Sequence, residues 1–291
     1  MAQPSAAPET VTQMPVLPPR AADSNKGSFG RVLVVAGSRG MSGAAVLCAS
    51  AALRGGAGLV YLAVPEGIQD RVATANPCYL TVALPQDDRG QVAGRAEADL
   101  LPLLQANDVA ALGPGLGRSQ ELTTLVARLL AQVRVPLVLD ADGLNALEGH
   151  SAELRRHAGP VVVTPHPGEF ARLAGCPIAD VQARRQERAA RFAAEHGVVV
   201  VLKGHGTVVT DGRRLHVNTT GNPGMATGGT GDVLTGLIAA LVGQGLEPFA
   251  AAQLGVHVHG LAGDLARDER GEVSLIASDL LDFLPYAFRN L

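Results

Sequence analysis

The chain alternates short apolar runs with segments of helical periodicity, and this alternation constrains its fold more than any other feature. Strand-like runs lie at residues 31–36, 58–64, 79–83, 108–112, 136–140, 160–164 and 198–202. Helical patterns separate many of them, at about 43–54, 119–132 and 180–196. Because the runs are apolar without interruption, we expect them to be buried on both sides, in a mostly parallel sheet with helices on both faces. The pattern predicts an α/β fold.

The C-terminal part of the chain extends this architecture. Residues 207–217 predict a small hairpin that turns at Asp211-Gly212. Two more helices are expected at 248–268 and 279–289, the second of them capped by Ser278.

The domain organisation predicted from the sequence is simple. No repeat or linker interrupts residues 24–291, which we interpret as one domain. The first twenty residues are rich in proline, alanine and threonine, so residues 1–23 predict a disordered leader that buries little apolar surface. Removal of residues 1–20 is therefore expected to leave stability and activity unchanged.

Composition excludes several classes of protein. The chain is 47% hydrophobic with a net charge of −3, which argues against a nucleic-acid partner. No apolar run reaches the length of a membrane span, so no membrane partner is expected either. The three cysteines, Cys48, Cys78 and Cys176, are isolated in the sequence. This spacing argues against a disulfide framework or zinc site and favours the cytoplasm.

A glycine-rich turn, Gly228-Gly229-Thr230-Gly231-Asp232, leads directly into a helix with one apolar face. The first turn of a helix offers unpaired N–H groups and a positive dipole end, and the glycines let the backbone approach an anion closely. Asp232 has a simpler interpretation as a helix cap worth about 1 kcal/mol. The density of glycine and threonine around it favours an anion hole at 228–231 with Asp232 as an adjacent base.

Two further glycine loops follow predicted strands, Gly37-Ser38-Arg39-Gly40 and Gly113-Pro114-Gly115-Leu116-Gly117. Sheets of this kind bind ligands at the carboxyl ends of their strands. Neither the G-x-G-x-x-G dinucleotide fingerprint nor a P-loop lysine motif is present. A single such loop is often only a tight turn, but together with residues 228–231 they indicate several phosphates held at once.

The segment Lys203-Gly204-His205-Gly206-Thr207 also closes a predicted strand. Only two of the 24 cationic side chains are lysines, Lys26 and Lys203. A lysine at this place can neutralise a phosphate, and the glycines would admit a nucleotide beside the backbone. The alternative, a lysine that merely extends to solvent at a strand end, fits its scarcity less well.

Carboxylates and a histidine complete the candidate residues. Two prolines restrict the backbone around His166, in Thr164-Pro165-His166-Pro167-Gly168-Glu169, which favours ligand contact by His166 over a plain helix-starting turn. Asp140 and Asp142 could hold Mg²⁺ through water, or Asp142 could only cap the following helix; both interpretations stand. Glu169 is a third candidate metal ligand, or a partner of the helix dipole.

Taken together, these motifs resemble the ribokinase-like superfamily and, within it, the ADP-dependent NAD(P)H-hydrate dehydratases. The resemblance spans about residues 24–288 and rests on Gly43-Ala44, 113–117, 140–145, 164–169, 203–207 and 222–232. It implies a ribokinase-like fold and ADP-dependent dehydration of the S-epimer of hydrated NADH and NADPH, with release of AMP and phosphate. It also implies Mg²⁺, a homotetramer and a separate NAD(P)H-hydrate epimerase, because the chain resembles the dehydratase alone.

The resemblance also assigns roles to individual residues. Asp232 would deprotonate the attacking hydroxyl. The hydrated dinucleotide would contact Asp232 together with Ala44, Gly117 and His166. The AMP moiety would contact Gly231 and the loop Lys203, Gly204, His205, Gly206 and Thr207. His205 stands where a small residue is expected.

Two other classes of function share part of the pattern. A ribokinase-like kinase for a hydroxymethyl or hydroxyethyl group of a vitamin precursor would use Asp232, but it needs neither the two extra glycine loops nor His166. A nucleotide-sensing protein without turnover would tolerate the glycines but gives no reason for Asp232 beside them.

Overall fold

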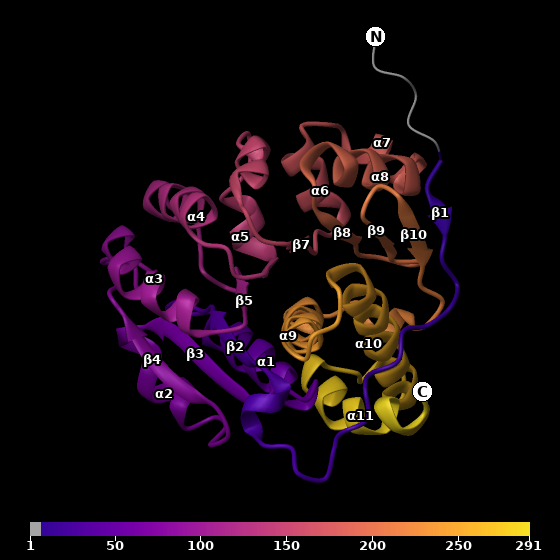
Figure 1. Cartoon of the computed structure of the whole chain (residues 1–291), viewed down its shortest axis with the longest axis horizontal. Coiled ribbons are helices and arrows are strands. Elements are labelled where there is room, and N and C mark those ends of the chain that lie inside the picture. Colours follow the sequence, from indigo (N-terminus) through magenta and orange to yellow (C-terminus); the bar gives the residue numbers. More distant parts are fainter. Residues whose placement is uncertain (1–6) are drawn as a thin grey trace.

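A ten-stranded sheet forms the centre of the computed structural model, which describes residues 7–291 (Figure 1). Its strand order is β1-β10-β9-β8-β7-β6-β5-β2-β3-β4, and neighbours are parallel except where β9 pairs with β8 and β10. The strands are β1 (Glu9–Thr10), β2 (Arg31–Val35), β3 (Leu59–Pro65), β4 (Leu80–Leu84), β5 (Val109–Leu112), β6 (Leu137–Leu139), β7 (Val161–Val163), β8 (Val199–Leu202), β9 (Val208–Thr210) and β10 (Arg214–Val217).

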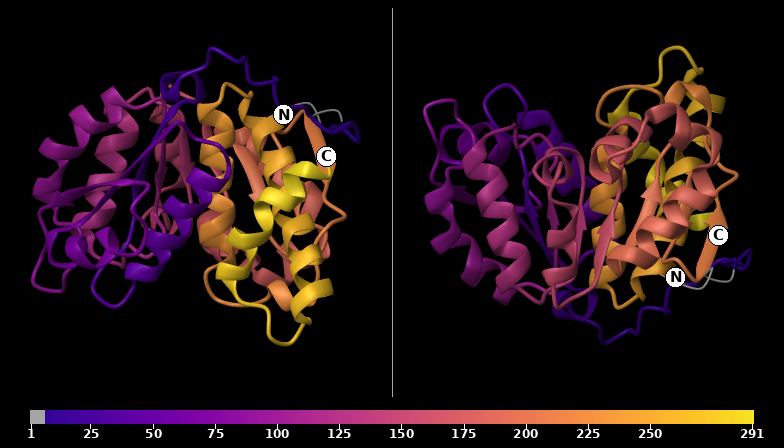
Figure 2. Two further views of the ribbon diagram at one scale, coloured as in Figure 1. Left: turned by 90° about the horizontal axis from the view of Figure 1, so that it is seen from below. Right: turned by 90° about the horizontal axis from the view of Figure 1, so that it is seen from above.

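Helices cover both faces of this sheet (Figures 1 and 2). One layer contains α1 (Ser42–Arg54), α2 (Gln69–Ala73), α9 (Thr230–Gly243), α10 (Pro248–Arg270) and α11 (Ala277–Arg289). The other contains α3 (Glu97–Ala106), α4 (Gln120–Gln132), α5 (Ala141–Asn145), α6 (Pro167–Ala174), α7 (Ile178–Ala183) and α8 (Arg185–His196).

The central strands show why the apolar runs are continuous. In β2, Val32 and Val34 pack into the core under the first layer, whereas Leu33 and Val35 pack under the second. Successive side chains of a strand point to opposite faces, so a strand covered on both sides is apolar at every position. The predicted α/β architecture is confirmed, including the hairpin of β9 and β10.

Two local predictions were wrong. The helix expected at 180–196 is two helices, because Arg184 leaves the helical conformation (φ −138°, ψ 46°) between α7 and α8. Apolar periodicity continues through such a break and does not reveal it. Ser278 does not cap α11, which begins at Ala277; the side chain of Asp279 instead accepts the N–H of Ile276 at 2.9 Å.

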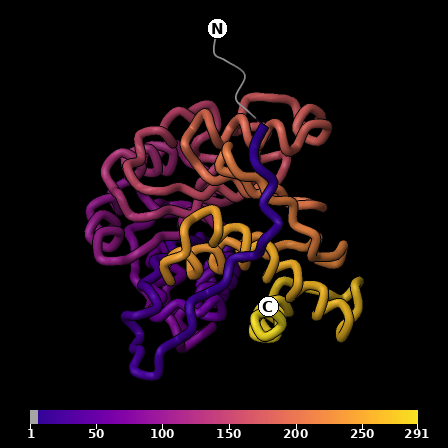
Figure 3. The backbone as a smooth tube through the Cα atoms, turned by 45° about the vertical axis from the view of Figure 1, so that its right-hand side comes forward, coloured from indigo at the N-terminus to yellow at the C-terminus, as the bar shows by residue number. Residues whose placement is uncertain are grey.

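The N-terminal segment differs from the expected disordered leader over residues 7–23; residues 1–6 lie outside the described part. This segment runs along the surface of the molecule (Figure 3). β1 pairs with β10, and the carbonyl of Gln13 accepts a hydrogen bond from Gln253 of α10 at 2.9 Å. Val11, Met14 and Leu17 pack against the core. Amino-acid composition indicates only how much apolar surface a segment can bury by itself. The N-terminal segment is instead held by contacts with β10 and α10, which lie far from it in the sequence.

Candidate active site

The carboxyl ends of β6, β7 and β8 meet in a group of ionic side chains. Lys203 follows β8, and its Nζ lies 2.7 Å from Asp140 Oδ1 and 3.9 Å from Glu169 Oε2. Asp140, which follows β6, is only 1% exposed, and its second oxygen accepts a hydrogen bond from Thr235 of α9 at 2.8 Å. We call these four residues the Lys203 cluster. Its partners satisfy charges that would otherwise be costly to bury.

The Lys203 cluster keeps its lysine cationic. Burial by itself lowers the pKa of Lys203, but the charges of Asp140 and Glu169 outweigh that effect, and the pKa lies above its usual range. The cluster therefore presents a fixed positive charge beside the glycine loop, since a Cβ on Gly231 would lie 3.1 Å from Nζ.

Asp142 ties another glycine loop to this edge of the sheet. Between it and Asp140, Ala141 has a left-handed backbone (φ 47°), a conformation that costs roughly 1–3 kcal/mol in a residue other than glycine. The two carboxylates reach different partners: Asp140 reaches Lys203, and Asp142 accepts the N–H of Gly117 at 2.8 Å. Asp142 lies inside the first turn of α5, so its interpretation as the helix cap was wrong.

The carboxylates around Lys203 do not form a metal site by themselves. Within residues 7–291 no group of three or more His, Cys, Asp or Glu is arranged to hold a metal ion. Asp140 and Glu169 both face Lys203, and Asp142 bonds to Gly117. Mg²⁺ keeps several waters and often uses only one or two carboxylates together with substrate phosphates. The residues therefore fit a magnesium ion that is bound mainly by a nucleotide, not a site built from protein ligands alone.

The glycine loop before α9 presents a row of unpaired amides. In the described part of the chain, the N–H groups of residues 228–231 donate to no protein acceptor. Gly229 has φ 95°, a backbone conformation that residues with a side chain rarely adopt. The hydroxyl of Thr230 lies 3.1 Å from the carbonyl oxygens of both Met225 and Thr227. This geometry suits an anion at the start of α9.

Asp232 lies in the first turn of α9, and its carboxylate has no hydrogen bond or ion pair with any residue from 7 to 291. Burial and then the charge of Asp140 raise its pKa, while Lys203 lowers it, and the resulting pKa is about 7. A carboxylate with a pKa near neutrality can take a proton from a hydroxyl and later return it.

A cavity of about 560 Å³ opens beside the loop and α9. The predicted nucleotide residues Lys203, Gly204, His205, Gly206, Thr207 and Gly231 all line it. Sequence reasoning missed the residues contributed by the 218–226 segment and α10, which are Asn218, Thr220, Asn222, Met225, Val256, His259 and Arg267. Asn222 stood in a motif with no role assigned; the α10 residues carried no sequence signal, because only packing brings that helix here.

The residues expected to contact the dinucleotide lie on adjoining loops. A Cβ on Gly115 would lie 3.0 Å from Ala44 Cβ, so α1 meets the 113–117 loop there. His166 caps α6: its Nδ1 accepts the N–H of Gly168 at 3.0 Å, and its side chain is 52% exposed. The helix-starting role weighed from the sequence is thus real, and the exposed ring leaves room for ligand contact as well.

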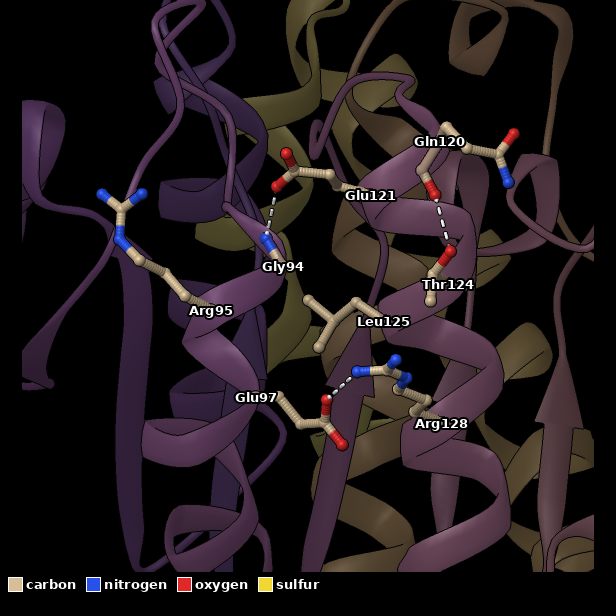
Figure 4. Close-up of a pocket in the computed structure, with 8 residues that line it drawn as sticks. All are labelled: Gly94, Arg95, Glu97, Gln120, Glu121, Thr124, Leu125 and Arg128. Carbon is tan, nitrogen blue, oxygen red and sulfur yellow. Dashed lines mark hydrogen bonds and ion pairs between the residues drawn. The ribbon is translucent and has the colours of Figure 1, made fainter.

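A second, polar pocket lies between residues 94–97 and α4 (Figure 4). Its side chains bond to one another: Glu121 accepts the N–H of Gly94 at 2.8 Å, and Arg128 pairs with Glu97 at 3.0 Å. None of the predicted site residues lines it.

No helix within residues 7–291 has the length and apolar character needed to cross a membrane.

Known proteins are similar to this chain over most of its length. The pattern of the NAD(P)H-hydrate dehydratase family matches residues 32–286. The bifunctional NAD(P)H-hydrate repair enzyme Nnr of Moorella thermoacetica is 51% identical over 277 residues, which cover 94% of this chain and 52% of the relative. The chain thus spans about half the length of the curated relatives that it matches.

Solved structures agree. The ADP/ATP-dependent NAD(P)H-hydrate dehydratase of Bacillus subtilis, crystallised with ATP and Mg²⁺, is 33% identical, with a TM-score of 0.80 over 94% of each chain. A ribokinase-like superfamily protein of Enterococcus faecalis is 28% identical, with a TM-score of 0.80 over 94% of this chain and 92% of the other. With its ribokinase-like sheet and a family match over most of its length, this chain belongs to the NAD(P)H-hydrate dehydratase family.

Proposed function

We propose that this protein removes water from the S-epimer of hydrated NADH and NADPH at the expense of ADP, with release of AMP and phosphate. The observation that carries the proposal is the unpartnered carboxylate of Asp232, with a pKa of about 7, beside a row of unpaired amides. Family membership supplies the substrate class.

The chemistry follows from the poor leaving ability of hydroxide. Asp232 takes the proton of the hydroxyl at C6 of the hydrated nicotinamide ring, and that oxygen attacks the β-phosphorus of ADP. The bond from this phosphorus to the bridging oxygen breaks, and AMP departs. The amides of 228–231 and the Lys203 ammonium stabilise the charge on the transferred phosphoryl group. The nitrogen lone pair then expels phosphate from C6 to leave an iminium ion, and loss of a proton from C5 to the departing phosphate forms the C5–C6 double bond of the dihydronicotinamide.

Magnesium would accompany the nucleotide. When bound, Mg²⁺ neutralises charge on the phosphate oxygens. Asp140 and Glu169 would hold its waters from the protein side, in keeping with a relative crystallised with ATP and Mg²⁺. Asp142 is the third candidate; like Asp140, its carboxylate has a partner on each oxygen, the N–H of Gly117 and the amide of Asn145.

A kinase for a small vitamin precursor is the competing function. It would share Asp232 and the nucleotide cavity. The 113–117 loop, which Asp142 ties to the sheet, and the exposed His166 favour a larger substrate with phosphates of its own. A sensor without turnover gives no reason for an unpartnered carboxylate beside the amides.

The decisive experiment incubates the purified protein with hydrated NADH and ADP or ATP, and follows the return of absorbance in the NADH band. Recovery that requires nucleotide and is lost in Asp232→Asn supports the proposal. Failure of hydrate to react, with phosphorylation of a hydroxyethyl- or hydroxymethyl-bearing compound instead, would establish the kinase function.

Assembly and location belong to the same proposal. We place the protein in the cytoplasm, in keeping with its free thiols Cys48, Cys78 and Cys176, where an epimerase activity would supply the S-epimer. The homotetramer is what the family resemblance implies, and the exposed apolar side chains near the C-terminus, Val273, Ile276 and Tyr286, offer surface for an interface. The apolar stretches 44–53 and 237–242 contribute mainly to the core and are not offered as the interface. Light scattering that returns only the 29.9 kDa monomer mass would refute an oligomer.

A further inference from the structure

We propose that His259 is a positioning residue. It holds the backbone of the anion hole in place, and it couples that backbone to a nucleotide bound in the adjacent cavity. The inference rests on the proposed function, because it assigns the amides of 228–231 to a transferred phosphoryl group. His259 belongs to α10, outside every motif that the sequence singled out.

The first observation is a contact between two helices. His259 Nε2 lies 2.9 Å from the carbonyl oxygen of Thr230, in the first turn of α9. A carbonyl only accepts, so Nε2 carries the hydrogen and donates it. This bond fixes from α10 the peptide plane that follows Thr230, and the N–H of Gly231 belongs to that same plane.

The second observation is how completely Thr230 is held. Its hydroxyl lies 3.1 Å from the carbonyls of Met225 and Thr227, and its carbonyl accepts from His259. Its own N–H, like that of Gly231, has no acceptor in the described part of the chain. A loop that contains Gly228 and Gly229 would otherwise be mobile, and amides that stabilise a transition state must be fixed before the reaction.

The third observation concerns the other ring nitrogen. Burial lowers the pKa of His259 to about 4, so the ring is neutral at physiological pH and Nδ1 keeps its lone pair. Nδ1 has no hydrogen-bond partner between residues 7 and 291, and His259 lines the nucleotide cavity. It can accept a hydrogen bond from a hydroxyl or amino group of the nucleoside. A bound nucleotide would then restrain the same ring that restrains Thr230.

A matched set of variants tests the positioning role. His259→Met keeps the bulk but removes the donor, and we expect kcat to fall by roughly 10- to 100-fold, less than the full loss of an anion-hole donor. His259→Gln can place its amide N–H near the former Nε2, so kcat should recover to within about fivefold of the parent. His257→Asn, two residues earlier on α10 and outside the cavity lining, should match the parent. A kcat for His259→Gln as low as that for His259→Met would overturn the proposal.

Two further measurements do not depend on turnover. AMP affinity should fall no more than about tenfold in His259→Met, because AMP loses one hydrogen bond. Nitrogen NMR of the histidine-labelled parent should show the Nε2-protonated neutral ring from pH 5 to 8, with Nδ1 shifting when AMP is added. A ring that titrates within that range, or that ignores AMP, would overturn the proposal even if His259→Met fails to fold. An inactive parent would overturn the proposed function instead, while these two measurements still decide the role of His259.

Discussion

Two adjacent regions of the site treat their polar groups in opposite ways. In the Lys203 cluster each charged group faces an opposite charge, and Asp140 has a partner on both oxygens. In the glycine loop at 228–232, the backbone amides and the carboxylate of Asp232 face no partner among residues 7–291.

The difference indicates that the two regions have different roles, one in positioning and one in ligand binding. Partnered charges hold their positions and set the local field, as when Asp140 raises and Lys203 lowers the pKa of Asp232. Unpartnered groups pay a desolvation cost in the free protein and recover it when a ligand binds. Changes in the loop should therefore affect turnover most, and changes in the cluster should affect nucleotide affinity and stability.

The largest effect is expected from Asp232→Asn. It removes the base but keeps the shape, so kcat should fall by about 10²–10⁴-fold while ADP affinity is preserved. Steady-state kinetics and calorimetry with ADP would check this. Activity within a few-fold of the parent would remove Asp232 from the mechanism.

The same variant has a stability signature that excludes misfolding. A folded-state pKa of about 7, above the usual 3.8, means that ionisation of Asp232 opposes folding increasingly as pH rises from about 4 to 7. Asp232→Asn should therefore melt at a higher temperature than the parent at pH 8. The difference should vanish well below the usual pKa of 3.8, where the carboxyl is protonated in both states.

Lys203→Ala should weaken ADP binding by roughly tenfold or more, equivalent to about 1.4 kcal/mol, because the phosphate loses its facing cation. Binding of the hydrate should change less, since Ala44 and Gly117 lie on other loops. Lys26→Ala removes the other lysine, which is exposed and far from the cluster in sequence, and serves as the control. Unchanged ADP affinity in calorimetry would contradict the placement of Lys203.

The pH dependence of the rate tests the raised pKa of Asp232, and a change of about tenfold is expected. The base must be ionised, so kcat/KM should rise from pH 6 to pH 8 by roughly that factor, with a midpoint near 7. Initial rates in buffers of constant ionic strength would show it. A profile that is flat across this range would indicate that Asp232 has an ordinary pKa and that the surrounding carboxylates do not act on it.

Thr235 tests whether the cluster is mainly a scaffold. Thr235→Val leaves one oxygen of the buried Asp140 without its hydroxyl partner, which should lower the free energy of unfolding by about 1–3 kcal/mol. Thr235→Ser restores the hydroxyl and should recover most of that loss. Urea denaturation measures both. Equal stability of the two variants would show that the bond to Asp140 contributes nothing.

The smallest effect is expected at a third region, remote from both. Deletion of residues 1–17 removes β1 and the apolar contacts of Val11, Met14 and Leu17. The melting temperature should fall by a few degrees, at about 2–4 °C per kcal/mol, with kcat unchanged. Deletion of residues 1–6 alone is the control. This reverses the sequence-based expectation, and an unaltered melting temperature would reinstate it.

Much of the molecule followed from the sequence by itself. Continuous apolar runs and helical periods determined a parallel sheet covered on both faces, since both patterns reflect burial that each segment must satisfy. The glycine turn before Asp232 and the loop after Lys203 were recognisable because backbone approach to an anion needs those residue types in sequence. Requirements of this kind are met by residues that are adjacent in the sequence, so the sequence alone reveals them.

Only the tertiary structure decided which residues meet across the site. Asp140 pairs with Lys203 instead of forming a dedicated metal site, Thr235 completes that pair, and His259 reaches Thr230 from α10. The edge of β10 likewise gives residues 9–10 a partner that their composition did not suggest. These contacts join positions far apart along the chain, and their energies depend on burial and distance that exist only once the sheet and helices have packed.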